Sequence, residues 1–302
     1  MGFAVSCSED DMDTGEPDSQ TYKTQVYLTD APVDNPEVEA VFITVTGVKV
    51  NGKSIEGFQK TTINVSELQN GETHLLGELE LESGTTSEIS LMLDNETNAS
   101  GEAPGNYILT NTGEKKTLVT TAAEININDD VEIWENNENQ IILDFDLRKI
   151  IGANNEGEYY FVTDSEISQS IRAVNSLDAG SITGTINDFG TIRSESMLVM
   201  AYEKGSYSET EEQANSEGIL FANAVTSARV NEAVGEFELH FVEEGDYELH
   251  FISYADTNNN GQLELEGEIE ATSANSINLS DFSVEAGGNV DLEIILIGLF
   301  GL

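Results

Sequence analysis

Basic side chains are scarce in this chain of 302 residues. It contains 12 Lys and Arg against 57 Asp and Glu, so its formal net charge is −45 at pH 7. Binding to nucleic acid, or through a polybasic patch to anionic lipid, relies on clustered Lys and Arg, and the sequence has no such cluster. Nucleic acid is therefore excluded as a partner, and cations are the expected ligands.

Cysteine and long apolar runs are also nearly missing. Cys7 is the only cysteine, which excludes an intrachain disulfide. No segment reaches the ~20 apolar residues that a membrane-spanning helix needs. The most apolar stretch, residues 294–302, is far shorter, and we expect it to form a buried last strand.

The lone cysteine follows small or compact side chains, Ala4-Val5-Ser6. This resembles the lipobox of bacterial lipoproteins, in which the cysteine receives a diacylglyceryl group and, once multiply acylated, anchors firmly in a membrane. A myristoylation pattern, Met1-Gly2 with Ser6, and an ordinary small apolar cysteine are the alternatives. Residues 1–5 supply neither the basic nor the apolar region of a signal peptide, which indicates a mis-called or trimmed start.

Acidic residues follow Cys7 immediately. Ser8-Glu9-Asp10-Asp11 resembles the export signal that directs Bacteroidetes lipoproteins to the outer face of the outer membrane. Almost nothing apolar occurs up to residue 21, so this stretch is expected to be a disordered, solvated tether. The predicted location is the outer membrane, with a lipid anchor at Cys7 and the rest of the chain exposed at the cell surface.

From residue 22 onwards the pattern is typical of β-strands. Val41–Thr46 is rich in β-branched residues, Gly47 shifts the apolar positions as a β-bulge would, and Asn51-Gly52 is typical of a tight hairpin turn. A polar join near residue 178 separates two such regions. We therefore predict an all-β protein with a tether over residues 1–21 and two β-sandwich-type domains over residues 22–178 and 179–302.

Further strands are predicted where apolar residues alternate between turn signals. They are Thr62–Val65, Glu88–Leu93, Tyr107–Leu109, Thr117–Thr120, Glu124–Asn128, Gln140–Leu147, Ser181–Ile186, Ser196–Tyr202, Gly235–Val242, Asp246–Tyr254 and Asn289–Leu296. Alternation predicts that Asp144, Asp146 and Arg148 face water. Residues 66–76 are expected to form a short helix or a loop, and the acidic stretch 205–218 an open loop.

Motifs in both domains resemble known families. In the first domain they occur in the order Tyr27–Asp34, Val45–Val48, Ser66–Gly71, Leu75–Gly77, Leu91–Asp94, Leu143–Asp146 and Ile171–Val174. Together they resemble the domain-of-unknown-function family 4382, which implies a β-rich domain of prokaryotic envelope lipoproteins and no established activity. In the second domain, Gly180–Ile186 and Gly245–Leu249 are similar to the opening strand and late hairpin of transthyretin-like or carboxypeptidase-regulatory sandwiches.

Oxygen ligands alternate in one segment of the second domain. Asp256, Asn258 and Asn260 match the first, third and fifth positions of an EF-hand calcium loop, and Glu264 follows them. Position twelve, where such a loop has a bidentate Glu, is Gly267, and no clear helices flank the segment. If Ca²⁺ binds, we expect these four residues to hold it on a loop between strands; an ion-free polar turn is the alternative.

Candidate catalytic groups are few. Asp144 and Asp146 resemble the paired acids of a glycosidase, but 57 acidic residues produce such pairs by chance. His240 and His250 would lie opposite each other across a hairpin at Gly245, without a third ligand for zinc. No nucleophile elbow, phosphate loop or metalloprotease helix occurs. We therefore expect that the protein is not an enzyme.

Three aromatic residues are candidates for contact with a ligand. Trp134, Tyr159 and Tyr160 are able to stack on sugar rings, and buried or strand-edge positions are the alternative. The leading hypothesis is a non-catalytic surface lipoprotein that acts as a binding or structural module, with calcium as a stabilising ion. A carbohydrate-binding or adhesion component, with a glycan or a surface protein as partner, is the first alternative, and a secreted hydrolase is the second.

Overall fold

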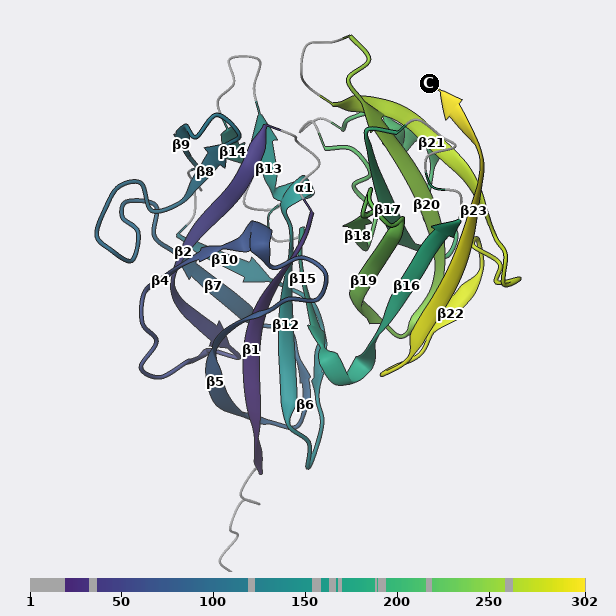
Figure 1. Cartoon of the computed structure of the whole chain (residues 1–302). Coiled ribbons are helices and arrows are strands. Elements are labelled where there is room, and N and C mark those ends of the chain that lie inside the picture. Colours follow the sequence, from purple (N-terminus) through teal and green to yellow (C-terminus); the bar gives the residue numbers. More distant parts are fainter. Residues whose placement is uncertain are drawn as a thin grey trace, which may run out of the picture.

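A computed structural model describes residues 20–32, 37–118, 123–153, 159–162, 167, 170–187, 189, 194–215, 219–258 and 263–301. Most of them lie in strands, which confirms the predicted all-β fold (Figure 1). The helical elements bounded within these ranges are single turns, namely η1 (Val65–Glu67), α1 (Leu147–Ile150), η2 (Ser176–Asp178) and η3 (Glu209–Glu212). No helix in the described ranges is long and apolar enough to cross a membrane.

One layer of the first domain is a four-stranded sheet in the order β15-β12-β1-β5. Its strands are β1 (Thr21–Ala31), β5 (His74–Glu82), β12 (Asn139–Asp146) and β15 (Ile171–Asn175). β1 runs antiparallel to β5 but parallel to β12, with Leu28 beside Leu143. The parallel pair therefore joins the start of the domain to its end.

The other layer is a seven-stranded sheet in the order β10-β7-β2-β8-β9, with β3 and β4 also paired to β2. Its strands are β2 (Val38–Val50), β3 (Lys53–Ser54), β4 (Thr61–Asn64), β7 (Ile89–Leu93), β8 (Tyr107–Thr110), β9 (Lys115–Thr117) and β10 (Glu124–Ile127). The pairing register shifts between Val45 and Gly47, which confirms the bulge. Asn51 and Gly52 both have positive φ and join β2 to β3, as the hairpin signal predicts.

Two short ribbons complete this domain, and a shared core holds its layers together. The ribbons pair β6 (Gly84–Thr86) with β11 (Val131–Ile133) and β13 (Ile151–Ala153) with β14 (Tyr159–Phe161). Inward-facing side chains of both sheets, among them Leu28, Ile43, Leu91 and Leu143, form one buried cluster. Alternation along the strands places these residues on the inner faces of the layers.

β12 is buried on both of its faces. Its other face carries Ile142, which forms a separate buried cluster with Val174 and Ala179 against Phe241 of the second domain. Asp144, Asp146 and Arg148 are buried as well. The expectation that these three side chains face water is wrong, because the second domain covers the side of β12 on which alternation places them.

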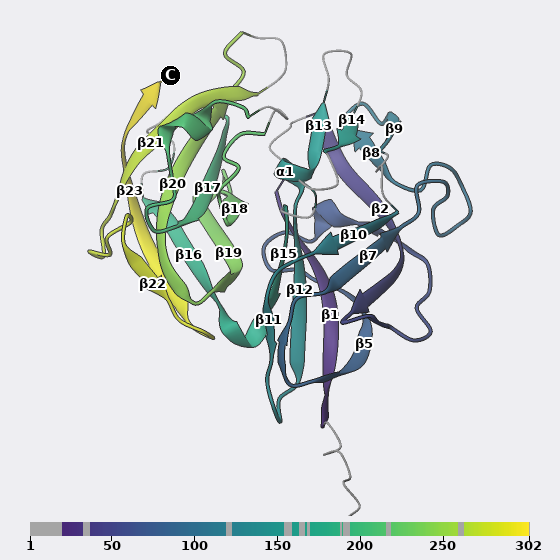
Figure 2. The ribbon, with the colours of Figure 1, turned by 180° about the vertical axis from the view of Figure 1, so that it is seen from behind.

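The second domain is built on one curved sheet of eight strands. They are β16 (Ala179–Asn187), β17 (Ser196–Glu203), β18 (Thr226–Arg229), β19 (Glu236–Glu243), β20 (Gly245–Ala255), β21 (Glu264–Ser273), β22 (Phe282–Val284) and β23 (Asn289–Gly301). Their order is β18-β17-β20-β21-β23-β16-β19, with β22 paired to β20. The end strands β18 and β19 contact each other, so the sheet nearly closes around a core that includes Val199, Phe251 and Leu292 (Figure 2).

Three local expectations for the second domain are wrong. β19 and β20 follow each other in sequence but are not neighbours in the sheet, so no hairpin forms at Gly245. The described part of residues 205–218 is not an open loop, since it contains η3 and the Tyr207 N–H donates to Glu248 Oε1 over 3.0 Å. The last strand is not fully buried, because Ile295 and Ile297 remain 41% and 58% exposed.

Candidate functional site

A group of buried charges lies at the junction between the two domains. Asp144 and Asp146 come from the end of β12, Arg148 and Lys149 from α1, and Arg172 from β15. The apolar residues of β12 pack into the core, and the acidic residues near the end of this strand are therefore buried as well. Buried charges are costly unless they are paired and hydrogen-bonded, so their partners decide what this group does.

Arg148 connects the first domain to a loop of the second. Its Nη2 lies 2.7 Å from Asp146 Oδ2, and its Nη1 donates to the carbonyl oxygens of Leu220 (2.6 Å) and Phe221 (3.0 Å). Those carbonyls belong to the loop between η3 and β18. A charge-assisted ion pair within one domain thereby orients a donor toward the backbone of the other.

Lys149 and Arg172 make the same kind of connection. Lys149 Nζ lies 3.4 Å from the carboxylate that binds Arg148 and donates to the carbonyl of Ala224. Arg172 Nη2 lies 2.8 Å from Asp144 Oδ2, while Nη1 donates to the carbonyl of Phe241. All three of these basic side chains, which belong to the first domain, therefore reach backbone oxygens of the second.

Gly71 marks a second close approach of the domains. Its φ is +78°, and a Cβ at this position would lie only 2.8 Å from His240 Cγ of β19. A side chain would be strained by the left-handed backbone and would also collide with the imidazole. The loop after η1 therefore needs glycine here for the domains to meet.

Asp30, on β1, is the remaining buried acid beside this group. Burial, followed by the nearby charges of Asp144 and Asp146, raises its pKa well above the ordinary value of an aspartate. Burial also lowers the pKa of Lys149, and the charge of Asp146 opposes that shift. Both directions favour the uncharged forms of these two side chains.

The chemistry of the group suits docking better than catalysis. Asp144 and Asp146 each bind a guanidinium, so both carboxylates take part in the ion pairs of the junction. A glycosidase needs one acid that gains and loses a proton near the working pH. The carboxylate pair that the sequence suggests for a hydrolase instead forms the base of the domain junction.

The predicted calcium segment joins β20 to β21. The Glu264 carboxylate accepts hydrogen bonds from the Thr257 hydroxyl and the Asn258 amide, and the Asp256 N–H donates to Glu195 Oε2 over 3.2 Å. Asn260 lies outside the described residues. Across the described ranges, no group of three His, Cys, Asp or Glu side chains is placed to hold a metal. Asn258 and Glu264 thus come together, and calcium binding stays a prediction.

The two histidines lie on strands that are not neighbours in the sheet. His240 Nε2 is 2.9 Å from Glu238 Oε2. His250 Nδ1 is 2.6 Å from Glu268 Oε1, and its ring stacks on Tyr207 with centroids 3.7 Å apart. Each imidazole therefore has its own carboxylate partner, and the expected facing pair does not form.

The three aromatic candidates do not form one platform. Trp134 is 45% exposed, and its Nε1 donates to both carboxylate oxygens of Asp178, over 2.8 and 3.0 Å. Tyr160 is 38% exposed, whereas Tyr159 is buried and its hydroxyl donates to Glu37 over 3.2 Å. Trp134 directly follows β11, and β14 with both tyrosines lies at the opposite end of the domain (Figure 2).

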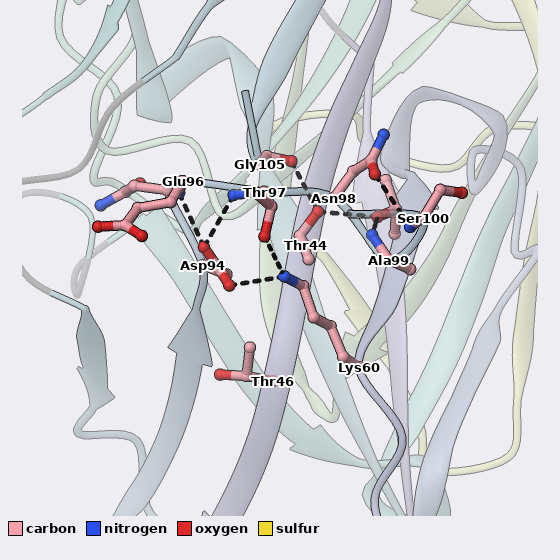
Figure 3. Close-up of polar contacts among 12 residues, drawn as sticks. Thr44, Thr46, Lys60, Asp94, Glu96, Thr97, Asn98, Ala99, Ser100 and Gly105 are labelled. Carbon is pink, nitrogen blue, oxygen red and sulfur yellow. Dashed lines mark hydrogen bonds and ion pairs between the residues drawn. The ribbon is translucent and has the colours of Figure 1, made fainter. Parts of the chain in front are cut away.

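A polar network braces the loop that follows β7 (Figure 3). Asp94 Oδ1 accepts from the N–H groups of Glu96 (2.8 Å) and Thr97 (3.1 Å), and Oδ2 lies 2.7 Å from Lys60 Nζ. The hydrogen bond from Lys60, then that from the Thr97 N–H, holds the pKa of Asp94 below its ordinary value. The network is part of the scaffold of the first domain.

Several of these residues were not recognised as candidates from the sequence. The sequence patterns indicate no functional role for Asp30, Lys149 or Arg172, and they place Arg148 at the surface. The signal that the sequence offers for these residues is the small number of basic side chains. Three of only 12 Lys and Arg residues lie together at one junction. Cys7, the predicted lipidation site, lies outside the described residues.

Some solved structures are similar to this chain at low identity. The Bacillus anthracis TIE protein is 14% identical, with 91% of this chain and 34% of that chain covered and a TM-score of 0.17. The major pilin subunit of Bacillus cereus is 10% identical (91% and 70% covered, TM-score 0.21), and a major pilin protein from Streptococcus pyogenes is 8% identical (91% and 96%, 0.19). The chain thus spans about a third of the length of the first of these proteins. Similarities this distant transfer neither a fold nor a function.

The comparison with protein families is more informative. No curated protein matches the chain. The family model described as "Domain of unknown function (DUF4382)" matches residues 22–162. That segment extends from the start of β1 to just past β14 and so includes most of the first domain. Residues 22–162 therefore match the family that the motifs of the first domain resemble.

Proposed function

We propose that the protein is a non-catalytic module of the bacterial cell surface, anchored in the outer membrane through an acylated Cys7. The domain junction is the observation that carries this proposal. Arg148, Lys149 and Arg172 of the first domain all donate to backbone carbonyls of the second. The buried charges thus hold two β-domains in one arrangement, which suits a structural or binding role.

The charge of the chain supports a location outside the cell. A net charge of −45 resists association with other polyanions and with anionic lipid surfaces. An acidic tether after an acylated cysteine would keep the folded domains in solvent and away from the membrane. Two or more acyl chains would then provide lasting attachment, since one alone binds only marginally.

Metabolic labelling combined with protease treatment of intact cells tests the anchor and the location together. The wild-type protein should incorporate a fatty-acid analogue and be digested by external protease, and Cys7→Ala should lose the label. Ser8→Ala is the matched control, because it changes the neighbouring residue and keeps the thiol. Unlabelled wild type, or a label retained by Cys7→Ala, would refute the lipid anchor. Wild type protected from external protease would refute surface display.

Glycan binding is the second candidate function, and the exposure of Trp134 favours it. Asp178 fixes the edge of the indole while 45% of the side chain remains accessible. A fixed aromatic ring loses little conformational freedom when a sugar stacks on it. A glycan array should show binding that Trp134→Ala abolishes and Tyr160→Ala, at a second exposed aromatic, leaves intact. An array without bound glycans would remove this candidate.

A further inference from the structure

A small, partly open cavity lies between the two domains. Asp30 and Asp144 line it from the first domain, and Thr226, Ser227 and His240 line it from the second. Its volume is about 20 Å³. A buried water needs roughly 10–15 Å³ and two to four polar partners, so the cavity has room for one water molecule.

Asp30 is the polar side chain in this cavity that most needs a partner. It is 7% exposed, and neither carboxylate oxygen has a hydrogen-bond partner of good geometry, although the Leu147 N–H and the Gln69 side chain approach it. The hydroxyl of Ser227, on the opposite wall, is also buried without a partner. An ionised carboxylate in this position would be a buried charge with incomplete solvation.

Charged groups from several elements surround Asp30 or line the same cavity. The charges of Asp144 and Asp146 on β12 act on Asp30, and Arg229 on β18 and Glu238 and His240 on β19 line the cavity. The basic side chains of α1 and β15 bind the two acids of β12, since Arg148 and Lys149 pair with Asp146 and Arg172 pairs with Asp144. No basic side chain among the described residues donates to the Asp30 carboxylate.

We propose that this cavity holds one water shared by Asp30 and Ser227, and that Asp30 carries a proton while the domains are docked, so that rising pH loosens the junction. A protonated carboxyl donates as well as accepts, so it can bond the water without placing a third negative charge beside Asp144 and Asp146. This inference goes beyond the proposed function, since it concerns how the two domains are held and released.

The sign of the effect follows from linkage. Burial and the charges of Asp144 and Asp146 raise the pKa of Asp30. Both acids stay beside it in the first domain, but separation would remove the burial that the second domain contributes and would lower the pKa toward that of an ordinary aspartate. The docked state therefore binds the proton more tightly, and docking is strongest below the pKa of the separated state. The docking equilibrium weakens by up to about tenfold per pH unit as the pH rises toward the raised pKa, and it is constant above that value.

Trp134 provides a reporter of this junction in the full chain. It is the only tryptophan, and its indole is bonded to Asp178 in the turn that links the domains. We would follow its fluorescence emission and the radius of gyration by X-ray scattering from pH 4 to 9. The wild type should change over this range, whereas Asp30→Asn should stay docked because its neutral side chain has no proton to lose. Asp246→Asn, at an exposed acid of β20, is the matched control and should behave as the wild type.

Two further measurements keep the proposal falsifiable if Asp30→Asn fails to fold. The carboxyl carbon resonance of Asp30 in the wild type should titrate above the ordinary aspartate range. Ser227→Ala should weaken docking at all pH values and retain the pH dependence, because it removes a partner of the water and leaves the acid. Ordinary titration of Asp30, a wild type unchanged from pH 4 to 9, or an Asp30→Asn profile that follows the wild type would each overturn the proposal.

Discussion

Arg148 satisfies one carboxylate and two carbonyls with a single guanidinium. Replacing it by methionine would preserve much of its volume but leave Asp146 and the two carbonyls without their strongest donor. Removing one partner of a buried ion pair costs about 3–5 kcal/mol, and we expect Arg148→Met to lower the free energy of unfolding by that amount. Urea denaturation followed by circular dichroism measures the change.

Lys49→Met is the matched control for this substitution. Lys49 pairs with Glu124 over 3.0 Å, but both side chains are more than a third exposed. Exposed pairs contribute about 0.2–1 kcal/mol, so the control should stay within that range. Equal effects of the two substitutions would contradict a special role of the junction.

Asp94 gives the opposite pH dependence from Asp30. Its pKa is lowered by Lys60 and by the Thr97 N–H, so its stabilisation is present above the unfolded pKa of about 4 and is lost as the pH falls through the folded pKa. Asp94→Asn should reduce the free energy of unfolding at pH 7 by about 1–2 kcal/mol. The difference from wild type should vanish in acid, and a difference that persists there would show that the charge is not responsible.

At the scale of elements, the features that depend only on nearby residues, such as a bulge or a tight turn, were predicted correctly. The bulge at Gly47 and the turn at Asn51-Gly52 follow from backbone preferences, and both occur as predicted. β5 and β21 were not predicted, although glutamates alternate with apolar residues in both, as on strands with one exposed face. The burial of Asp144 could not be predicted, since alternation indicates two faces of a strand but not which surfaces cover them.

The connection between β20 and β21 carries the prediction for calcium. Isothermal titration calorimetry should detect Ca²⁺ binding to the wild type and none to Asp256→Ala, because calcium requires a shell of oxygen ligands. Asp291→Ala, at an exposed acid of β23, should bind as the wild type does. Absence of heat from the wild type would leave the segment as an ion-free polar turn.

At the scale of the whole molecule, a charge of −45 should make stability depend on salt. Like charges repel over about 30 Å at 0.01 M ionic strength but over only about 3 Å at 1 M. We expect the thermal unfolding midpoint at pH 7 to rise between these salt concentrations. The rise should nearly disappear close to the sequence pI of 4.1, where the net charge is small. Equal stability at low and high salt at pH 7 would contradict the prediction.

The position of the first strand of each domain has a mechanical consequence. β1 lies between β5 and β12, and β16 lies between β19 and β23, so each strand is hydrogen-bonded along both edges. A force applied through a tether before β1 would act along that strand. This direction is nearly perpendicular to the hydrogen bonds of the antiparallel edge, so the hydrogen bonds to β5 and to β12 would be loaded in shear. A force transmitted through η2, which joins the two domains, would likewise act along β16 and load its hydrogen bonds to β19 and β23. Each domain would therefore take tension on an interior strand, where many bonds must break together before the chain extends.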